Sequence, residues 1–169
     1  GQSITEVTPI GVARYICAIA NGGTVLEAQI VDKILSSDGA VVTEKEPVVV
    51  NQIEGAEEHL SIIREGMHGV ISAEDGGTAA KYWSDFPNTD QIGAKTGTAQ
   101  INQIDIENSA WFVAFAPFDD PEIAIVVSIT NGYSGGAASL TSQNVFTYSF
   151  EKLQEQEKST LTQPNSYLP

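Results

Sequence analysis

The chain has 169 residues, of which 41% are apolar, and this is enough to form the core of one globular domain. Its 8 basic residues face 22 acidic ones, and the formal net charge of -14 excludes nucleic acid and anionic lipid as expected partners. No apolar run reaches about 18 residues, and residues 1–10 carry no signal-peptide pattern. We therefore expect any targeting or anchoring segment to lie outside this chain.

The first predicted element is an amphipathic helix that begins at Pro9. Thr8 offers a hydroxyl at the N-cap position, and proline is favoured at the first helical position. Apolar residues recur at helical spacing up to Ala20, and the sequence Asn21-Gly22-Gly23 is expected to end the helix. The single cysteine, Cys17, falls within this pattern, so we interpret it as a buried small side chain without an internal disulfide partner.

A hairpin and a second helix are predicted next. Residues 25–42 alternate loosely and contain the turn signal Asp38-Gly39, which predicts a two-stranded excursion. Apolar residues from Glu57 to Ile71 share one helical face, which predicts a helix that two glycines weaken. The residues of that face are Leu60, Ile63, Met67 and Ile71. A short helix is predicted through residues 77–83.

The second half of the chain predicts three strands followed by a terminal helix. The strands are expected at residues 92–100, 110–118 and 123–130, and the short polar links at 102–109 and 119–122 favour antiparallel pairing. The helical pattern after Gly135-Gly136 is carried by Leu140, Val145, Tyr148 and Leu153. Helices, an antiparallel meander and a final helix together predict an α+β fold over residues 1–156, with a polar C-terminal tail at 157–169.

The sequence GAKTGTAQ, residues 93–100, is the strongest candidate for a functional site. In a strand, the side chains of Thr96 and Thr98 point to one side and that of Lys95 to the other, so a site that uses all three lies at the rim of a cleft. The small residues Gly93, Ala94, Gly97 and Ala99 leave the backbone open to an approaching peptide. A lysine charge, hydroxyls for a carboxylate and a free N–H at Thr98 for an oxyanion are what acyl transfer requires.

This stretch has two other possible interpretations. A phosphate-binding loop requires glycine directly before the lysine and again five residues earlier, but the chain has Ala94 and Thr89 there. That pattern is therefore not met. Taken alone, Lys95-Thr96-Gly97 is equally compatible with a polar strand that contains a glycine bulge.

Several segments, in their order along the chain, resemble the C-terminal half of the transpeptidase domain of penicillin-binding proteins, which cross-link peptidoglycan. The high-molecular-weight class B enzymes are the most similar. The segments are residues 1–23, 64–70, 76–81, 93–100, 110–117 and 123–129. The resemblance implies that residues 1–156 are the C-terminal portion of such a domain, with a partial penicillin-binding protein and serine β-lactamase-like fold, an antiparallel sheet flanked by helices.

The resemblance also implies roles for the residues of this strand. Lys95-Thr96-Gly97 matches the third active-site motif of the family. Lys95 would supply positive potential beside the nucleophile, and Thr96 and Thr98, with Gly97 between them, would hold the carboxylate of the D-Ala-D-Ala donor or of a β-lactam. The Thr98 N–H would form half of the oxyanion hole. Lys95 and Thr98 are thus the predicted catalytic residues, and Thr96, Gly97 and Thr98 the predicted substrate-binding residues.

The first two motifs of the family, S-x-x-K and S-x-N, are expected before Lys95, and neither occurs there. Ser149 and Lys152 fit the first pattern and Ser142-Gln143-Asn144 the second, but in reversed order on the predicted terminal helix, so we interpret both as non-catalytic. The resemblance therefore implies that an N-terminal half of the domain carries the serine, that this half is a partner of the chain, and that the chain alone is inactive.

The predicted function is that of a peptidoglycan D,D-transpeptidase that forms a serine acyl-enzyme with stem peptides and is acylated by β-lactams. No metal or organic cofactor is expected, and His59 and His68 match no metal-ligand spacing. The resemblance places the parent protein on the outer face of the bacterial cell membrane, anchored by a segment absent here. The alternatives are a serine β-lactamase or D,D-carboxypeptidase, and a non-catalytic β-lactam-sensing or scaffold domain.

Overall fold

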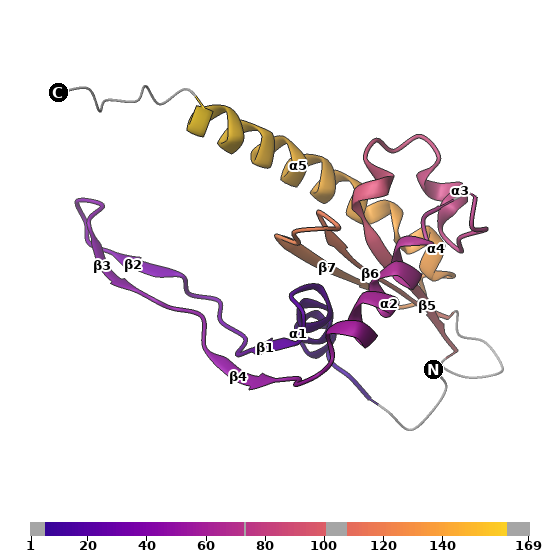
Figure 1. Cartoon of the computed structure of the whole chain (residues 1–169), viewed down its shortest axis with the longest axis horizontal. Coiled ribbons are helices and arrows are strands. Elements are labelled where there is room, and N and C mark those ends of the chain that lie inside the picture. The colour runs from indigo at the N-terminus through magenta and orange to yellow at the C-terminus, as the bar shows by residue number, and fades with distance from the viewer. Residues whose placement is uncertain (1–5, 73, 101–107, 162–169) are drawn as a thin grey trace.

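The computed structural model describes residues 6–72, 74–100 and 108–161 and has the predicted α+β fold (Figure 1). A three-stranded antiparallel sheet lies at its centre, in the order β5 (Gly93–Ala99), β6 (Ser109–Ala116) and β7 (Ile123–Ile129). The three predicted strands and their antiparallel pairing are confirmed. Most of the predicted link between the first two, residues 101–107, lies outside the described residues.

Alternating side chains of β6 divide the core into two layers, one on each face of the sheet. Val113 and Phe115 pack against α1 (Pro9–Ala20) and α2 (Glu57–His68) on one face. Phe112 and its even-numbered neighbours on β6 pack on the opposite face. The elements that cover this second face are α3 (Ala80–Trp83), the short helix α4 (Gly135–Ala138) and the first turns of α5 (Leu140–Leu161). A 3-10 turn, η1 (Thr89–Gln91), leads into β5.

Helix α1 forms as the sequence predicts. The Thr8 hydroxyl accepts a hydrogen bond from the Gly11 N–H at 3.2 Å, and Pro9 occupies the first helical turn. The Asn21 N–H donates to the Cys17 carbonyl at 2.9 Å where the helix ends. Cys17 is only partly buried, and this burial raises the pKa of its thiol.

The packing face of α2 differs from the predicted one at one position. Leu60 and Met67 are buried, but Ile63 is 43% exposed, so its predicted place in the core is wrong. Arg64 turns inward instead, with its guanidinium 5.4 Å from the ring centroids of both Phe115 and Phe118. These two rings, and the Phe118 carbonyl that accepts a hydrogen bond from Arg64, make the inward position favourable for an arginine.

The predicted face of the terminal helix is also wrong. Leu140, Val145 and Tyr148 are exposed and Leu153 is half-buried, whereas Phe146 and Ser142 are fully buried and Phe150 packs against the same core. Small serine side chains let this part of the chain lie close to the core. The buried Ser142 hydroxyl is not left without a partner, because it donates a hydrogen bond to the Ser139 carbonyl at 2.6 Å. Helix α5 continues to Leu161, through the predicted start of the tail at residue 157, and residues 162–169 lie outside the described residues.

The predicted hairpin is confirmed, and it forms the outer part of a longer arm that projects from the body of the molecule (Figure 1). Strands β2 (Lys33–Leu35) and β3 (Val41–Glu44) pair at its outer end, and β1 (Thr24–Leu26) and β4 (Val49–Gln52) pair at its base. The Ser36 N–H donates to the Ala40 carbonyl at 2.9 Å to close the turn, and Gly39 adopts a φ of 87° that favours glycine.

Candidate active-site strand

Strand β5 presents its polar side chains at the rim of the sheet. Within the described residues β5 pairs with β6 alone, so its other edge has no strand partner. Gly93 and Ala94 are buried, whereas Lys95 and Thr98 are exposed and Thr96 is intermediate. The buried start of the strand fixes its position, and the exposed remainder is accessible to a ligand.

The Lys95 side chain lies along its own strand. Its Nζ donates a hydrogen bond to the carbonyl of Thr96 at 2.6 Å. The ammonium group is therefore held beside the threonines even though its side chain leaves the strand from the opposite side. This geometry keeps a positive charge at the edge where a carboxylate or an oxyanion could bind.

Thr98 is held by the start of α4. Its Oγ1 accepts a hydrogen bond from the Gly135 N–H at 3.2 Å. A Cβ atom at Gly135 would lie 2.4 Å from the carbonyl oxygens of both Gly97 and Trp111, so only glycine allows this close approach. Ser134 caps α4 by accepting from the Ala137 N–H at 3.3 Å.

Thr96 is held from a different direction. The Oγ1 atoms of Thr78 and Thr96 lie 2.8 Å apart in a hydrogen bond whose donor either hydroxyl can be. Thr78 lies in the loop between α2 and α3, and backbone hydrogen bonds fix that loop on both sides of it. The Gly77 N–H donates to the Ser72 carbonyl at 2.9 Å, and the Ala79 N–H donates to the Val70 carbonyl at 3.0 Å.

Gly97, which is predicted to leave the strand open to a ligand, also has a structural reason to be small. A Cβ atom at Gly97 would lie 3.2 Å from the Cβ of Trp111, its cross-strand neighbour, which is a tight contact. A small residue is therefore favoured at this position, on the face of the sheet that it shares with Trp111.

Tyr82 packs against α4, the helix that holds Thr98. A Cβ atom at Gly136 would lie 2.7 Å from the Tyr82 ring, so the two are in close contact. Hydrogen bonds with Lys81 and Ser134 lower the pKa of the Tyr82 hydroxyl. Tyr82 thereby links α3 to the N-terminal end of α4.

The serine and lysine patterns downstream of β5 lie on α5, apart from this strand. Ser142 is fully buried and bonded to the Ser139 carbonyl. Lys152 points its Nζ to Glu155 at 2.7 Å and lies 5.6 Å from the Tyr148 ring centroid. These contacts agree with the interpretation of both patterns as parts of a packing helix.

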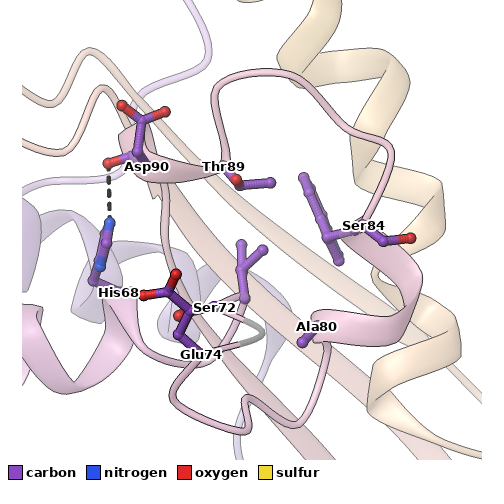
Figure 2. A pocket seen from close by; sticks show the side chains of 9 residues that line it. His68, Ser72, Glu74, Ala80, Ser84, Thr89 and Asp90 are labelled. Atoms are coloured by element: carbon purple, nitrogen blue, oxygen red, sulfur yellow. Dashed lines mark hydrogen bonds between the residues drawn. The ribbon is translucent and has the colours of Figure 1, made fainter.

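A separate pocket of about 370 Å³ lies between the C-terminal end of α2, α3 and η1 (Figure 2). His68 hydrogen-bonds the Asp90 carbonyl at 3.0 Å on one side of it, and Glu74 and Ser84 also line it. It contains no residue of β5. Within the part of the chain that the structure describes, no three His, Cys, Asp or Glu side chains gather as metal ligands do, and no helix is both long and apolar enough to span a membrane.

The family model described as penicillin binding protein transpeptidase domain matches residues 1–150 of the chain. The chain belongs to this family. This confirms the resemblance that the sequence segments indicate, and it accounts for an α+β fold with helices on both faces of an antiparallel sheet.

Individual relatives agree with the family. The chain is 29% identical over 138 residues to penicillin-binding protein 2B of Streptococcus pneumoniae, which covers 74% of this chain and 20% of that protein. It is 27% identical over 175 residues to the peptidoglycan D,D-transpeptidase MrdA of Haemophilus influenzae, covering 94% of this chain and 26% of that one. This penicillin-binding protein sequence thus spans a fifth to about a quarter of the length of these curated relatives.

A solved structure gives the same result. The imipenem acyl-enzyme complex of penicillin-binding protein A from Mycobacterium tuberculosis superimposes with a TM-score of 0.71 at 25% identity, over 89% of this chain and 32% of that chain. That relative is acylated by imipenem, and the matched 89% of this chain corresponds to about a third of it.

Two contacts of the site were not predicted from the sequence, those of Thr78 and Gly135. Thr78 falls within residues 76–81, which carry the resemblance without an assigned role, and Gly135 only marks the point after which a helical pattern is predicted. A signal was present in both places, because small residues cluster next to each, but neither cluster indicates which strand it contacts.

Proposed function

We propose that the chain is the C-terminal part of a peptidoglycan D,D-transpeptidase, and that another part of the same domain carries the nucleophilic serine. The observation that carries the proposal is the open edge of β5, where two threonine hydroxyls and a lysine ammonium lie together. Membership of a family that includes a named D,D-transpeptidase supports the same conclusion.

In the proposed reaction the donor is a stem peptide that ends in D-Ala-D-Ala. The serine Oγ attacks the carbonyl of the penultimate residue, a C–O bond forms, and the peptide C–N bond breaks as the leaving D-alanine amine takes up a proton. An amine of a neighbouring peptide then attacks the ester, which restores the serine and forms the cross-link. A β-lactam acylates the same serine through its ring amide.

The residues of β5 have distinct roles in this proposal. The hydroxyls of Thr96 and Thr98 donate hydrogen bonds to the terminal carboxylate of the donor, and the Thr98 N–H binds the oxyanion of the tetrahedral intermediate. Lys95 supplies the positive potential that favours both anionic groups. No step requires a metal ion or an organic cofactor.

The partners and the location follow from this reaction. The partners are the serine-bearing part of the domain, the peptidoglycan stem peptide and β-lactams. Because the stem peptide is outside the cytoplasmic membrane, the parent protein acts at the outer face of that membrane, held there by an anchoring segment.

The test is intact-mass analysis after incubation with benzylpenicillin, on this chain alone and on this chain combined with the serine-bearing part. We expect the combined domain to gain the mass of the drug, on a serine outside this chain. An adduct on the isolated chain would overturn the assignment of the nucleophile to another part. If the combined domain gains no adduct, the transpeptidase proposal itself is wrong.

Substitutions then test the assigned strand. Thr98→Val removes one hydroxyl that binds the carboxylate, and we expect acylation by benzylpenicillin to slow about tenfold, the effect of one hydrogen bond to a charged group. Ser149→Ala is the matched control, because it removes a hydroxyl from the S-x-x-K pattern on α5, and it should leave the rate unchanged. Equal losses in both variants would contradict the assignment of the site to β5.

A further inference from the structure

The two threonines of β5 are hydrogen-bonded through their hydroxyls to two separate segments of the chain, the first residue of α4 and the loop between α2 and α3. Gly135, at the start of α4, donates its N–H to Thr98 Oγ1 at 3.2 Å. Thr78, between α2 and α3, places its own Oγ1 2.8 Å from Thr96 Oγ1. Thr78 is 18 residues from its partner along the chain, so tertiary structure alone brings the two together.

The direction of the first bond is fixed by chemistry. A backbone N–H can only donate, so Thr98 accepts from Gly135 and keeps its own proton for another acceptor. Thr98 is therefore held as a hydrogen-bond donor toward any ligand at the open edge of β5.

The direction of the second bond depends on what binds. Each hydroxyl can donate one proton and accept in return, so either of Thr78 and Thr96 can be the donor. A carboxylate has no proton to give and requires Thr96 to donate to it. Thr78 must then donate to Thr96, and a chain of two hydrogen bonds forms in one direction. Such chains strengthen their members, because each bond polarises the next.

We propose that Thr78 is a positioning residue for carboxylate recognition, which acts by donating to Thr96 and thereby holding the Thr96 hydroxyl as a donor to the ligand. This inference rests on the proposed function of β5. Thr78 does not touch the reacting atoms. Thr78 donates a hydrogen bond to the Thr96 Oγ1, as the Gly135 N–H does to the Thr98 Oγ1. Both threonine hydroxyls are then left to donate their protons to the same carboxylate.

The loop that carries Thr78 suits this role. Backbone hydrogen bonds from Gly77 and Ala79 fix it on both sides of Thr78, and Ala79 is fully buried. The Thr78 side chain itself is exposed, so its hydroxyl is not needed to fill the core. A change at Thr78 that keeps its volume is therefore expected to leave the fold intact.

The test uses the complete transpeptidase domain, this chain together with its serine-bearing part. The variants are Thr78→Val, which keeps the shape and removes the hydroxyl, and Thr78→Ser, which keeps the hydroxyl. Thr43→Val is the matched control, because Thr43 is exposed on β3 of the arm. For each protein, the second-order rate constant of acylation is measured with a penicillin and with its methyl ester, which lacks the carboxylate charge.

We expect Thr78→Val to lower the rate constant for the penicillin about fivefold, the net effect of one hydrogen bond, and to change that for the ester much less. The ratio of the two rate constants should therefore fall in Thr78→Val, and return in Thr78→Ser. In a Thr96→Val background, Thr78→Val should have no further effect on this ratio, because its partner hydroxyl is gone.

The outcomes separate this inference from the proposed function. If the unmodified domain is not acylated, the proposed function fails and the role of Thr78 fails with it. If the unmodified domain is acylated and Thr78→Val lowers the penicillin and ester rates equally, Thr78 has only a structural role. An unchanged ratio in Thr78→Val, or a ratio that Thr78→Ser does not restore, also overturns the inference while leaving the proposed function in place.

Discussion

The β5–β6–β7 sheet and the β1–β4 arm are both antiparallel and both rich in β-branched residues, but they differ in burial. Six of the eight residues of β6 are buried, whereas every residue of β2, β3 and β4 is exposed. Val113 on β6 is 8% exposed, and Val42 on β3 is 64% exposed. The same residue type thus contributes to a core in one region and faces water in the other.

The difference shows that local strand propensity does not decide where the stability of this chain lies. The sheet has helices on both faces, so most side chains of β6 are removed from water on whichever face they lie. The arm has only two paired strands at any point along its length, and such ribbons are marginally stable in water. The candidate active-site strand β5 belongs to the first region, which gives its threonines a rigid support.

The largest expected effect is the loss of a ring from the centre of the sheet. Phe112 is fully buried, and its ring stacks on Trp83 with 5.9 Å between centroids. Phe112→Ala should lower the free energy of unfolding by about 3–5 kcal/mol, because it removes apolar contacts and leaves a cavity. Urea unfolding followed by tryptophan fluorescence measures this. A loss below about 1 kcal/mol would show that the sheet is not the stable region.

The next largest effect is expected at Gly135, where α4 packs on the sheet and holds Thr98 of the candidate site. Gly135→Ala would place a methyl group 2.4 Å from the carbonyl oxygens of Gly97 and Trp111 and push α4 away from β5. We expect a loss of about 1–3 kcal/mol in the free energy of unfolding and weaker support of Thr98. The matched control is Gly66→Ala on the exposed side of α2, where a Cβ meets nothing within 4 Å.

The control substitution, Gly66→Ala, is expected to change the free energy of unfolding in the opposite direction. Alanine is favoured over glycine inside a helix by about 1 kcal/mol, so Gly66→Ala should stabilise the protein. Both variants are compared by urea unfolding. If Gly135→Ala is also neutral or stabilising, α4 does not pack against β5 as closely as the structure indicates.

Much of the fold could be predicted from the sequence because its signals are local. The cap at Thr8, the turn at Asp38-Gly39 and the alternating, aromatic and β-branched patterns of the three strands each fix their own element. The faces of two helices could not be predicted in the same way. Hydrophobicity alone selects Ile63 for the core, but two phenylalanine rings from distant segments make Arg64 the better neighbour.

The buried face of the terminal helix could not be predicted for a related reason. Its face is predicted from its large apolar residues, yet the chain is held just before the helix at Ser139, which is fully buried and accepts a hydrogen bond from the Trp83 Nε1 at 2.8 Å. A buried serine with a partner behaves as a small core residue, and its partner is 56 residues away. Periodicity within the helix contains no information about that contact.

In the candidate site, too, the residues with a local signal could be predicted and the long-range contacts could not. The three polar residues of β5 could be found because their types and alternation are themselves a signal. The groups that hold two of them could not, because Gly135 is 37 residues from Thr98 and Thr78 is 18 residues from Thr96. Which small loop residue meets which strand is decided only when the sheet and its helices pack.

The smallest expected effect is on the arm, and it tests the comparison directly with one substitution made in both regions. Val113→Ala on β6 removes two buried methyl groups and should cost at least about 1.5 kcal/mol of unfolding free energy. Val42→Ala on β3 removes groups that already face water, so the change should stay within about 0.5 kcal/mol. A loss at Val42 as large as that at Val113 would mean that the arm is covered in solution. The arm would then be stabilised by a contact with something outside this chain's own fold, and its strands would be buried there as those of the sheet are buried here.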